Sequence, residues 1–287
     1  MTASRLPRAL TEGPRTRHAA RMRLAAGRPT SSSFLAACLA FLAGCVGAPQ
    51  QKPAQLRVVT YNIRHGAGMD GRVDLARTAA TLSALAPDIV ALQEVDESVA
   101  RSGRVDQAAE LGRALGMHAA FASFMDYQGG RYGLALLSRM PIRSQRVVPL
   151  PPGDEPRAAL LVEVEADNGV AVSVVCVHFN WVADDTKRFA QASTLCASLD
   201  ALDTPWIVAG DYNDVSGSRT LALFDARAKN AAKPAGSTAT FPADRPEREI
   251  DFVYAAPQGR WLVQQARVVE EKAASDHRPV LAVLELR

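Results

Sequence analysis

The sequence is poor in cysteine, in long apolar runs and, beyond its first segment, in basic charge, and each shortage excludes or disfavours a class of protein. Four cysteines among 287 residues are too few for a disulfide-stapled fold, and the spacing of Cys176 and Cys196 matches no zinc-binding motif. The most prominent apolar run, eleven residues from Phe34, is about half of the roughly 20 that a membrane-spanning helix needs. In an oxidising compartment the two thiols could pair, and buried free thiols are the open alternative.

The positive charge of the chain belongs to its first segment. The sequence has 33 basic and 30 acidic residues, but seven arginines and a single acid precede Cys45. The remainder therefore holds 26 basic against 29 acidic residues, a formal charge of about −3. Proteins that bind long nucleic acids without sequence preference usually carry a basic face. The slightly acidic charge balance thus lowers the expectation of a nonspecific DNA-binding protein, although a local cleft can still be basic.

The first segment has the pattern of an export signal: arginines, then the apolar run from Phe34, then small residues. It ends in "LAGC", which resembles the lipobox of bacterial lipoproteins. We therefore predict a signal peptide over residues 1–44 and a lipid anchor on Cys45, with a plain secretory signal as the alternative. Met1 and Met22 are both candidate starts. The expected location is the periplasmic side of a bacterial cell envelope, with the protein anchored to the membrane through Cys45.

The rest of the chain is expected to form a short linker and one domain. Residues 45–55 are polar and proline-bearing, which is typical of a tether, and residues 56–287 contain no comparable break. Apolar runs there predict strands, and two stretches with helical periodicity predict helices. The strands are expected at 56–62, 88–94, 132–138, 158–166, 170–179, 206–211, 250–255, 260–269 and 279–286, and the helices at 73–86 and 183–200. This pattern indicates an α/β or α+β sandwich with buried sheets.

Several of the predicted strands end on a side chain that can do chemistry. Asn62, Glu94, His178 and Asp211 each follow an apolar run. In open α/β folds, ligands bind beyond the carboxyl ends of strands. A single acid at a strand end is usually the start of a solvated loop, whereas four such ends favour a shared site.

Seven short motifs carry a resemblance to a known family. In order, they are "TYNIRHG", "LQEV", "YGLALLSR", "VHFN", "GDYND", "REIDFVY" and "SDHRPV", and they extend from Thr60 to Val280. Each motif is weak alone, but the ordered set resembles the endonuclease/exonuclease/phosphatase superfamily of DNase I-like proteins. The resemblance implies a four-layer αββα sandwich of two mixed sheets, of the α/β (α+β) class. It also implies divalent-metal-dependent hydrolysis of phosphate esters at one edge of the sheets.

The resemblance assigns a metal site to three residues. Glu94 matches the metal-binding glutamate of the family, and Asn62 and Asp276 would complete or flank the site. Oxygen ligands of this kind suit Mg²⁺, or Mn²⁺, which takes only one or two carboxylates from a protein and keeps several waters.

The resemblance also assigns the catalytic residues. His277 would face the phosphate, held by Asp251, and is either the general base or a phosphate stabiliser. Asp211 and Asn213 match the "GDxN" pair and would orient or deprotonate the attacking water, which makes Asp211 the other candidate base. His178 would donate to a nonbridging oxygen, a role that favours its protonated form.

The chain departs from the family pattern near its substrate-binding motif. Many relatives have "GNA" where this chain has "GLA", so Leu134 replaces an amide. Arg131 or Tyr132, just upstream, would then bind the phosphate. After the "VH" motif, Phe179 and Trp181 form either a stacking lip beside the site or part of the core.

The leading hypothesis is an exported, lipid-anchored phosphoesterase that acts as a monomer on a phosphodiester or phosphomonoester. Its substrate is a small molecule, a lipid headgroup or a nucleic acid. The alternatives are a nuclease acting on DNA and a binding protein that kept the fold without its chemistry. All the residues that chemistry needs are present, which disfavours the binding protein.

Overall fold

The structure is a computed structural model that describes residues 53–287. The predicted signal peptide, residues 1–44, and Cys45 lie outside the described residues, as does most of the predicted linker. The first strand begins at Ala54, so the last residues assigned to the linker belong to a sheet instead.

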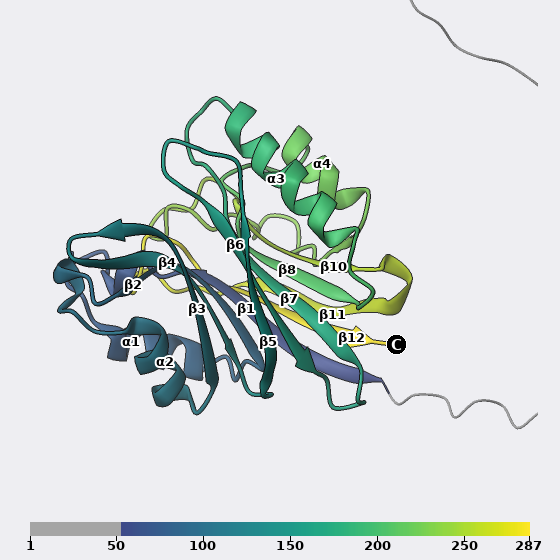
Figure 1. Cartoon of the computed structure of the whole chain (residues 1–287), viewed down its shortest axis with the longest axis horizontal. Coiled ribbons are helices and arrows are strands. Elements are labelled where there is room, and N and C mark those ends of the chain that lie inside the picture. Colours follow the sequence, from purple (N-terminus) through teal and green to yellow (C-terminus); the bar gives the residue numbers. More distant parts are fainter. Residues whose placement is uncertain (1–52) are drawn as a thin grey trace, which may run out of the picture. The chain divides into compact units, whose positions relative to one another are not determined.

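Two mixed six-stranded sheets form the body (Figure 1). The first has the order β11-β12-β1-β2-β4-β3, and the second has the order β5-β6-β7-β8-β10-β9. The strands of the first sheet are β1 (Ala54–Asn62), β2 (Ile89–Glu97), β3 (His118–Tyr127), β4 (Gly130–Ser138), β11 (Trp261–Val268) and β12 (Val280–Leu286). Those of the second are β5 (Ile142–Pro149), β6 (Ala158–Glu165), β7 (Ala171–His178), β8 (Trp206–Asp211), β9 (Lys229–Asn230) and β10 (Asp251–Ala256).

Helices cover the outer faces of both sheets. The helices α1 (Leu75–Ser83) and α2 (Gln107–Leu115) pack on the first sheet, and α3 (Thr186–Leu199) and α4 (Arg219–Asp225) pack on the second (Figure 1). The predicted four-layer αββα sandwich is therefore confirmed. Within residues 53–287, none of the helices has the length and apolar character that a membrane crossing requires.

Each sheet is buried on both faces, which explains its near-continuous apolar strands. One side of every central strand contributes to a core between the sheets, where Leu136, Val162 and Val174 are fully buried. The other side packs beneath the helices, as with Leu92 under α2 and Val208 under α3. Cys176 and Cys196 are free, buried thiols, so the open question of their pairing is answered.

The sequence predicted nine strands and two helices, and it missed the elements with weak patterns. The edge strand β5 is exposed along most of its length, and β3, at an edge of the first sheet, is partly exposed. The helices α2 and α4, of nine and seven residues, were also missed, although Asp106 and Ser218 cap their first turns.

Two parallel strand pairs bring the functional side chains to one edge. In the first sheet β1 runs parallel to β2, with Asn62 opposite Gln93. In the second sheet β7 runs parallel to β8, with His178 opposite Asp211. Because the carboxyl ends of parallel strands meet at the same sheet edge, the four polar strand ends found in the sequence converge.

We predict that Gly210→Ala destabilises the fold. A Cβ at Gly210 would lie 2.1 Å from the backbone oxygen of Val177, so β8 must shift away from β7. Overpacking of this kind costs about 1–3 kcal/mol, which urea unfolding would measure. Gly259→Ala is the matched control, since a Cβ there has no heavy atom within 4 Å. Equal stability of the two variants would contradict the prediction.

Candidate active site

A cavity of about 450 Å³ lies where these strands end. One part of its lining consists of predicted site residues: Glu94, His178, Asp211, Asn213, Asp276 and His277. Another part is cationic and aromatic: Arg101, Arg157, Arg248, Tyr127, Tyr132 and Trp181. Residues more than 180 positions apart in the chain thus share one concave, polar site.

Glu94 projects into the cavity from a distortion of β2. The register of β2 against β4 shifts between Leu92 and Val95, and Glu94 has a φ of +59°. A bulge of this kind re-aims a side chain, and a positive φ in a non-glycine residue persists only where surrounding structure holds it. The bulge therefore turns a strand residue toward the site.

Asn62 lies behind Glu94 and joins the two sheets. Its Nδ2 atom donates to Glu94 Oε1 at 3.0 Å and to Asp211 Oδ2 at 3.2 Å. The side chain is 1% exposed and is not part of the cavity lining. The structure thus places Asn62 between two acids that it orients, and its assignment to the metal site stays a prediction.

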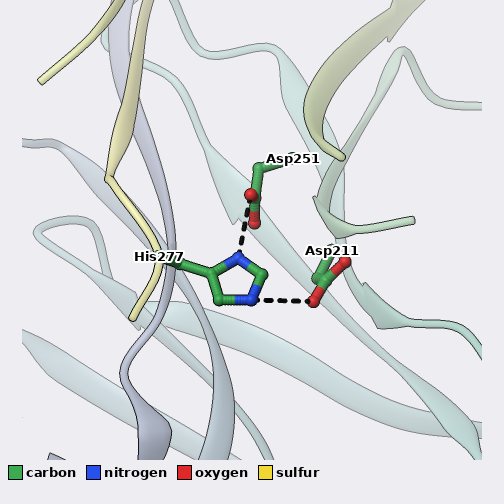
Figure 2. A group of neighbouring side chains, drawn as sticks. All are labelled: Asp211, Asp251 and His277. Atoms are coloured by element: carbon green, nitrogen blue, oxygen red, sulfur yellow. Dashed lines mark hydrogen bonds and ion pairs between the residues drawn. The ribbon is translucent and has the colours of Figure 1, made fainter. Parts of the chain in front are cut away.

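His277 lies between two buried acids. Its Nδ1 atom is 3.0 Å from Asp251 Oδ2, and its Nε2 atom is 3.6 Å from Asp211 Oδ2 (Figure 2). Burial alone would lower the pKa of His277, but the carboxylates of Asp251 and Asp211 outweigh it and raise this pKa to about 10. The imidazole is therefore protonated at neutral pH and has no lone pair with which to accept a proton.

Asp211 is a buried acid whose pKa lies near neutral pH. Burial raises the pKa of its carboxyl to about 7, with His277 acting against this rise and Asp251 adding to it. The backbone N–H of Asn213 donates to Asp211 Oδ1 at 2.8 Å, in a turn where Asn213 has a φ of +49°, a conformation that asparagine tolerates. An acid that titrates near neutral pH is suited to exchange protons with a reacting group.

His178 is neutral. Its Nε2 atom lies 3.5 Å from Asp211 Oδ2, yet burial, with Arg157 and His277 nearby, holds the pKa of His178 well below its usual value. The sequence interpretation favoured a protonated His178. The structure differs because the ring is buried beside two cationic groups, which no short motif reveals.

Glu94 and Asp276 are two carboxylates of the cavity lining that interact as like charges. Burial raises the pKa of Glu94, and the neighbouring Asp276 raises it further, against the Asn62 hydrogen bond that lowers it. Asp276 accepts from Ser275 Oγ at 3.3 Å and lies 3.7 Å from Arg64 Nε. Two adjacent carboxylates at a cavity wall are stabilised by a bound cation.

A second group of possible metal ligands is the trio in Figure 2. Among the described residues, Asp211, Asp251 and His277 offer ligand atoms that all lie within 4.8 Å of one another. Metal binding requires a neutral imidazole, whereas the acids on either side hold His277 protonated. A cation at the trio would have to displace this proton, and we assign the trio to proton handling.

The two predicted substrate-binding residues lie in different places. Tyr132 lines the cavity and is 6% exposed. Arg131 is not part of the lining: it forms an ion pair with Glu97 and lies over the ring of Phe121. This follows from the alternation of β4, which sends adjacent side chains to opposite faces.

The sequence analysis missed Arg157, the residue before β6. Arg157 is 4% exposed and lines the cavity, and its Nε and Nη1 atoms have no hydrogen-bond partner among the described residues. Its Nη2 atom pairs with Glu155 at 3.0 Å, and its Cζ atom lies 5.1 Å from the centre of the Phe124 ring. A buried guanidinium with free donors is suited to an anionic ligand. The available signal was a lone arginine directly ahead of an apolar strand.

Comparison with known proteins agrees with this geometry. The sequence model of the endonuclease/exonuclease/phosphatase family matches residues 59–277. The chain belongs to this family. No curated protein sequence matches the chain. Members of this family are typically hydrolases that act on phosphate esters.

Solved structures share the fold. An endonuclease/exonuclease/phosphatase from Beutenbergia cavernae is 26% identical, with a TM-score of 0.63 over 81% of this chain and 72% of that one. The catalytic domain of human Nocturnin, with bound sulfate, is 18% identical, with a TM-score of 0.65 over 81% and 95% of the two chains. A mannosyl-6-phosphatase from Bacteroides thetaiotaomicron is 18% identical, with a TM-score of 0.64 over 80% and 99%.

We predict that Asp251→Asn lowers the pKa of His277. The substitution removes the nearest opposite charge while keeping the shape of the side chain, and losses of this kind shift a pKa by about 1–3 pH units. A histidine NMR titration of the wild-type protein and of the Asp251→Asn variant would measure the change. An unchanged titration of His277 would show that Asp251 does not hold its proton.

Proposed function

We propose that the protein is a divalent-metal-dependent hydrolase of small phosphate esters. The observation that supports it most is the convergence of Glu94, Asp211 and His277 in one cavity, each with a pKa displaced by burial and by charged neighbours. Displaced pKa values that separate an acid from a base are typical of catalytic sites.

Glu94 and Asp276 would hold the metal, and the residues present fit one. Both carboxylates line the cavity, Asp276 raises the pKa of Glu94, and the buried amide of Asn62 donates to Glu94 Oε1. Mg²⁺ or Mn²⁺ would neutralise charge on the phosphoryl oxygens and stabilise the leaving oxygen. Asn62 would keep Glu94 in the orientation that such binding needs.

Arg157 and His277 would hold the phosphoryl group. The free Nε and Nη1 donors of Arg157 suit two phosphoryl oxygens, and the imidazolium of His277 adds a third cationic donor. Because Asp251 fixes the ring of His277, this donor is oriented before the substrate arrives. His178, being neutral, would donate one N–H to the same group.

Asp211 would be the general base. It titrates near neutral pH, its Oδ1 accepts from the Asn213 backbone, and its Oδ2 accepts from Asn62 and faces the two histidines. With His277 protonated, Asp211 is the better of the two candidate bases for accepting the proton of the attacking water. Asn213 would keep the acid in place.

A small substrate fits the cavity better than a long polymer. A volume of about 450 Å³ is in the usual range for small-molecule sites. The formal charge of about −3 after Cys45 also gives no general attraction to nucleic acids. One solved neighbour is named as a mannosyl-6-phosphatase, which makes a phosphomonoester a reasonable first substrate to test. Export and lipid anchoring through Cys45 stay part of the proposal, on sequence grounds alone.

We expect the wild-type protein to hydrolyse 4-nitrophenyl phosphate or its bis-ester with Mg²⁺ or Mn²⁺, and EDTA to abolish turnover. Glu94→Gln should reduce kcat by about 100-fold or more, because the neutral amide binds a cation poorly. Glu97→Gln is the matched control, since Glu97 is on the same strand but pairs with Arg131 outside the cavity. Metal-independent turnover, or equal loss in both variants, would contradict the proposal, and cleavage of plasmid DNA alone would favour the nuclease alternative.

We expect Arg157→Met to lower kcat/KM by about 10-fold to 100-fold, since each hydrogen bond from a charged donor contributes about 1.5–3 kcal/mol. Steady-state kinetics on the ester that the wild type prefers would measure it. Arg131→Met should leave kcat/KM unchanged, because its guanidinium lies outside the cavity. If Arg131→Met caused the greater loss, the phosphate would not bind where we place it.

A further inference from the structure

The two aromatic residues after the "VH" motif have opposite environments. Phe179 is fully buried and packs edge-on against Tyr212 at 5.5 Å. Trp181 is 59% exposed and lines the cavity. Among residues 53–287 it is the most exposed large hydrophobic side chain, while the other two tryptophans, Trp206 and Trp261, are buried. The core therefore accounts for Phe179 and leaves the position of Trp181 unexplained.

The backbone around Trp181 is fixed on both sides. The buried Arg188 donates from Nη1 to the carbonyl oxygens of Asn180, at 3.0 Å, and Val182, at 2.9 Å. Its Nε atom donates to Asp214 Oδ2 at 3.0 Å, within a buried ion pair. Hydrogen bonds from a buried guanidinium to both flanking carbonyls hold the segment in one conformation. The exposed indole is thus attached to a fixed backbone segment, residues 179–182, which we call the Trp181 frame.

This frame is connected to both ends of the proposed catalytic site. The carbonyl oxygen of Phe179 accepts from Asn213 Nδ2 at 3.0 Å, which ties the segment to the "GDxN" turn. Asn180 Oδ1 accepts from the backbone N–H of Asp154 at 2.9 Å, which ties it to the loop that carries Arg157. The backbone that carries the indole is therefore tied to the loop that carries Arg157.

We propose that Trp181 is a specificity-determining residue that stacks against a ring in the alcohol part of the substrate while the phosphate lies at Arg157. An exposed indole face beside a phosphate site provides favourable contact for the flat face of an aryl group, a nucleobase or a sugar. The substrate class is thus a phosphate ester whose alcohol carries a ring. This inference rests on the proposed phosphoesterase function and adds the chemistry of the leaving group.

Kinetics on four monoesters tests the inference: 4-nitrophenyl phosphate, adenosine 5′-monophosphate, glucose 6-phosphate and glycerol 3-phosphate. Trp181→Ala should raise KM by about 10-fold or more for at least one ring-bearing ester, with kcat nearly unchanged, and should leave glycerol 3-phosphate unaffected. The first three esters show which kind of ring stacks. Trp181→Phe should restore most of the lost affinity for an aromatic ring. Val147→Ala is the control, because Val147 is 41% exposed but lies outside the cavity lining.

Binding without turnover gives a second measurement. The two other tryptophans are buried, so the red-shifted part of the tryptophan emission comes from Trp181. Phenylphosphonate, which is not hydrolysed, should change this emission at lower concentration than methylphosphonate does, and Trp181→Phe should remove the response. Comparable half-saturation concentrations for the two phosphonates would overturn the stacking.

The two failures are distinguishable. If the wild type hydrolyses ring-bearing and open-chain esters and Trp181→Ala affects both equally or neither, the stacking role is wrong and the phosphoesterase proposal stands. If the wild type hydrolyses no ester with either metal, the phosphoesterase proposal fails, and the phosphonate titration still decides whether the indole binds a ring.

Discussion

The amide of Asn62 is the contact on which the site depends. From the end of β1 it donates to Glu94 in its own sheet and to Asp211 in the other. Without this bridge, two buried carboxylates from facing sheets would lie close together with no donor between them, which is costly. One neutral side chain thus sets the spacing between the acid we assign to the metal and the acid we assign to the water.

The charged groups of the site fall into two sets, one around His277 and one around Glu94, Asp276 and Arg157. On one side, Asp251 and Asp211 keep His277 protonated, and Lys233 supports Asp251 by donating to its backbone oxygen at 2.8 Å while pairing with Glu249. On the other side, Glu94 and Asp276 interact as like charges, with Arg64 Nε 3.7 Å from Asp276, while Arg157 has unused donors. We assign the two carboxylates to a cation and the donors of Arg157 to a phosphoryl group, so binding would complete an arrangement that the fold has already prepared.

The sequence predicted the parts of the fold whose patterns are local. The strand over 206–211 was predicted with the bounds that β8 has, because it is apolar and flanked by loops. The edge strand β5, exposed along most of its length, has no such pattern. The ordered motifs identified Glu94, Asp211 and His277. The neutral state of His178, the bridging role of Asn62 and the free donors of Arg157 arise from contacts between distant segments, so no short motif could predict them.

The central claim is that the cation binds at Glu94 and Asp276, with the His277 trio left free to move protons. Crystals soaked in Mn²⁺ would test it through anomalous scattering. The account predicts a peak within about 2.0–2.6 Å of a Glu94 carboxylate oxygen. A peak bound instead by Asp211, Asp251 and His277, with none at Glu94, would contradict the account.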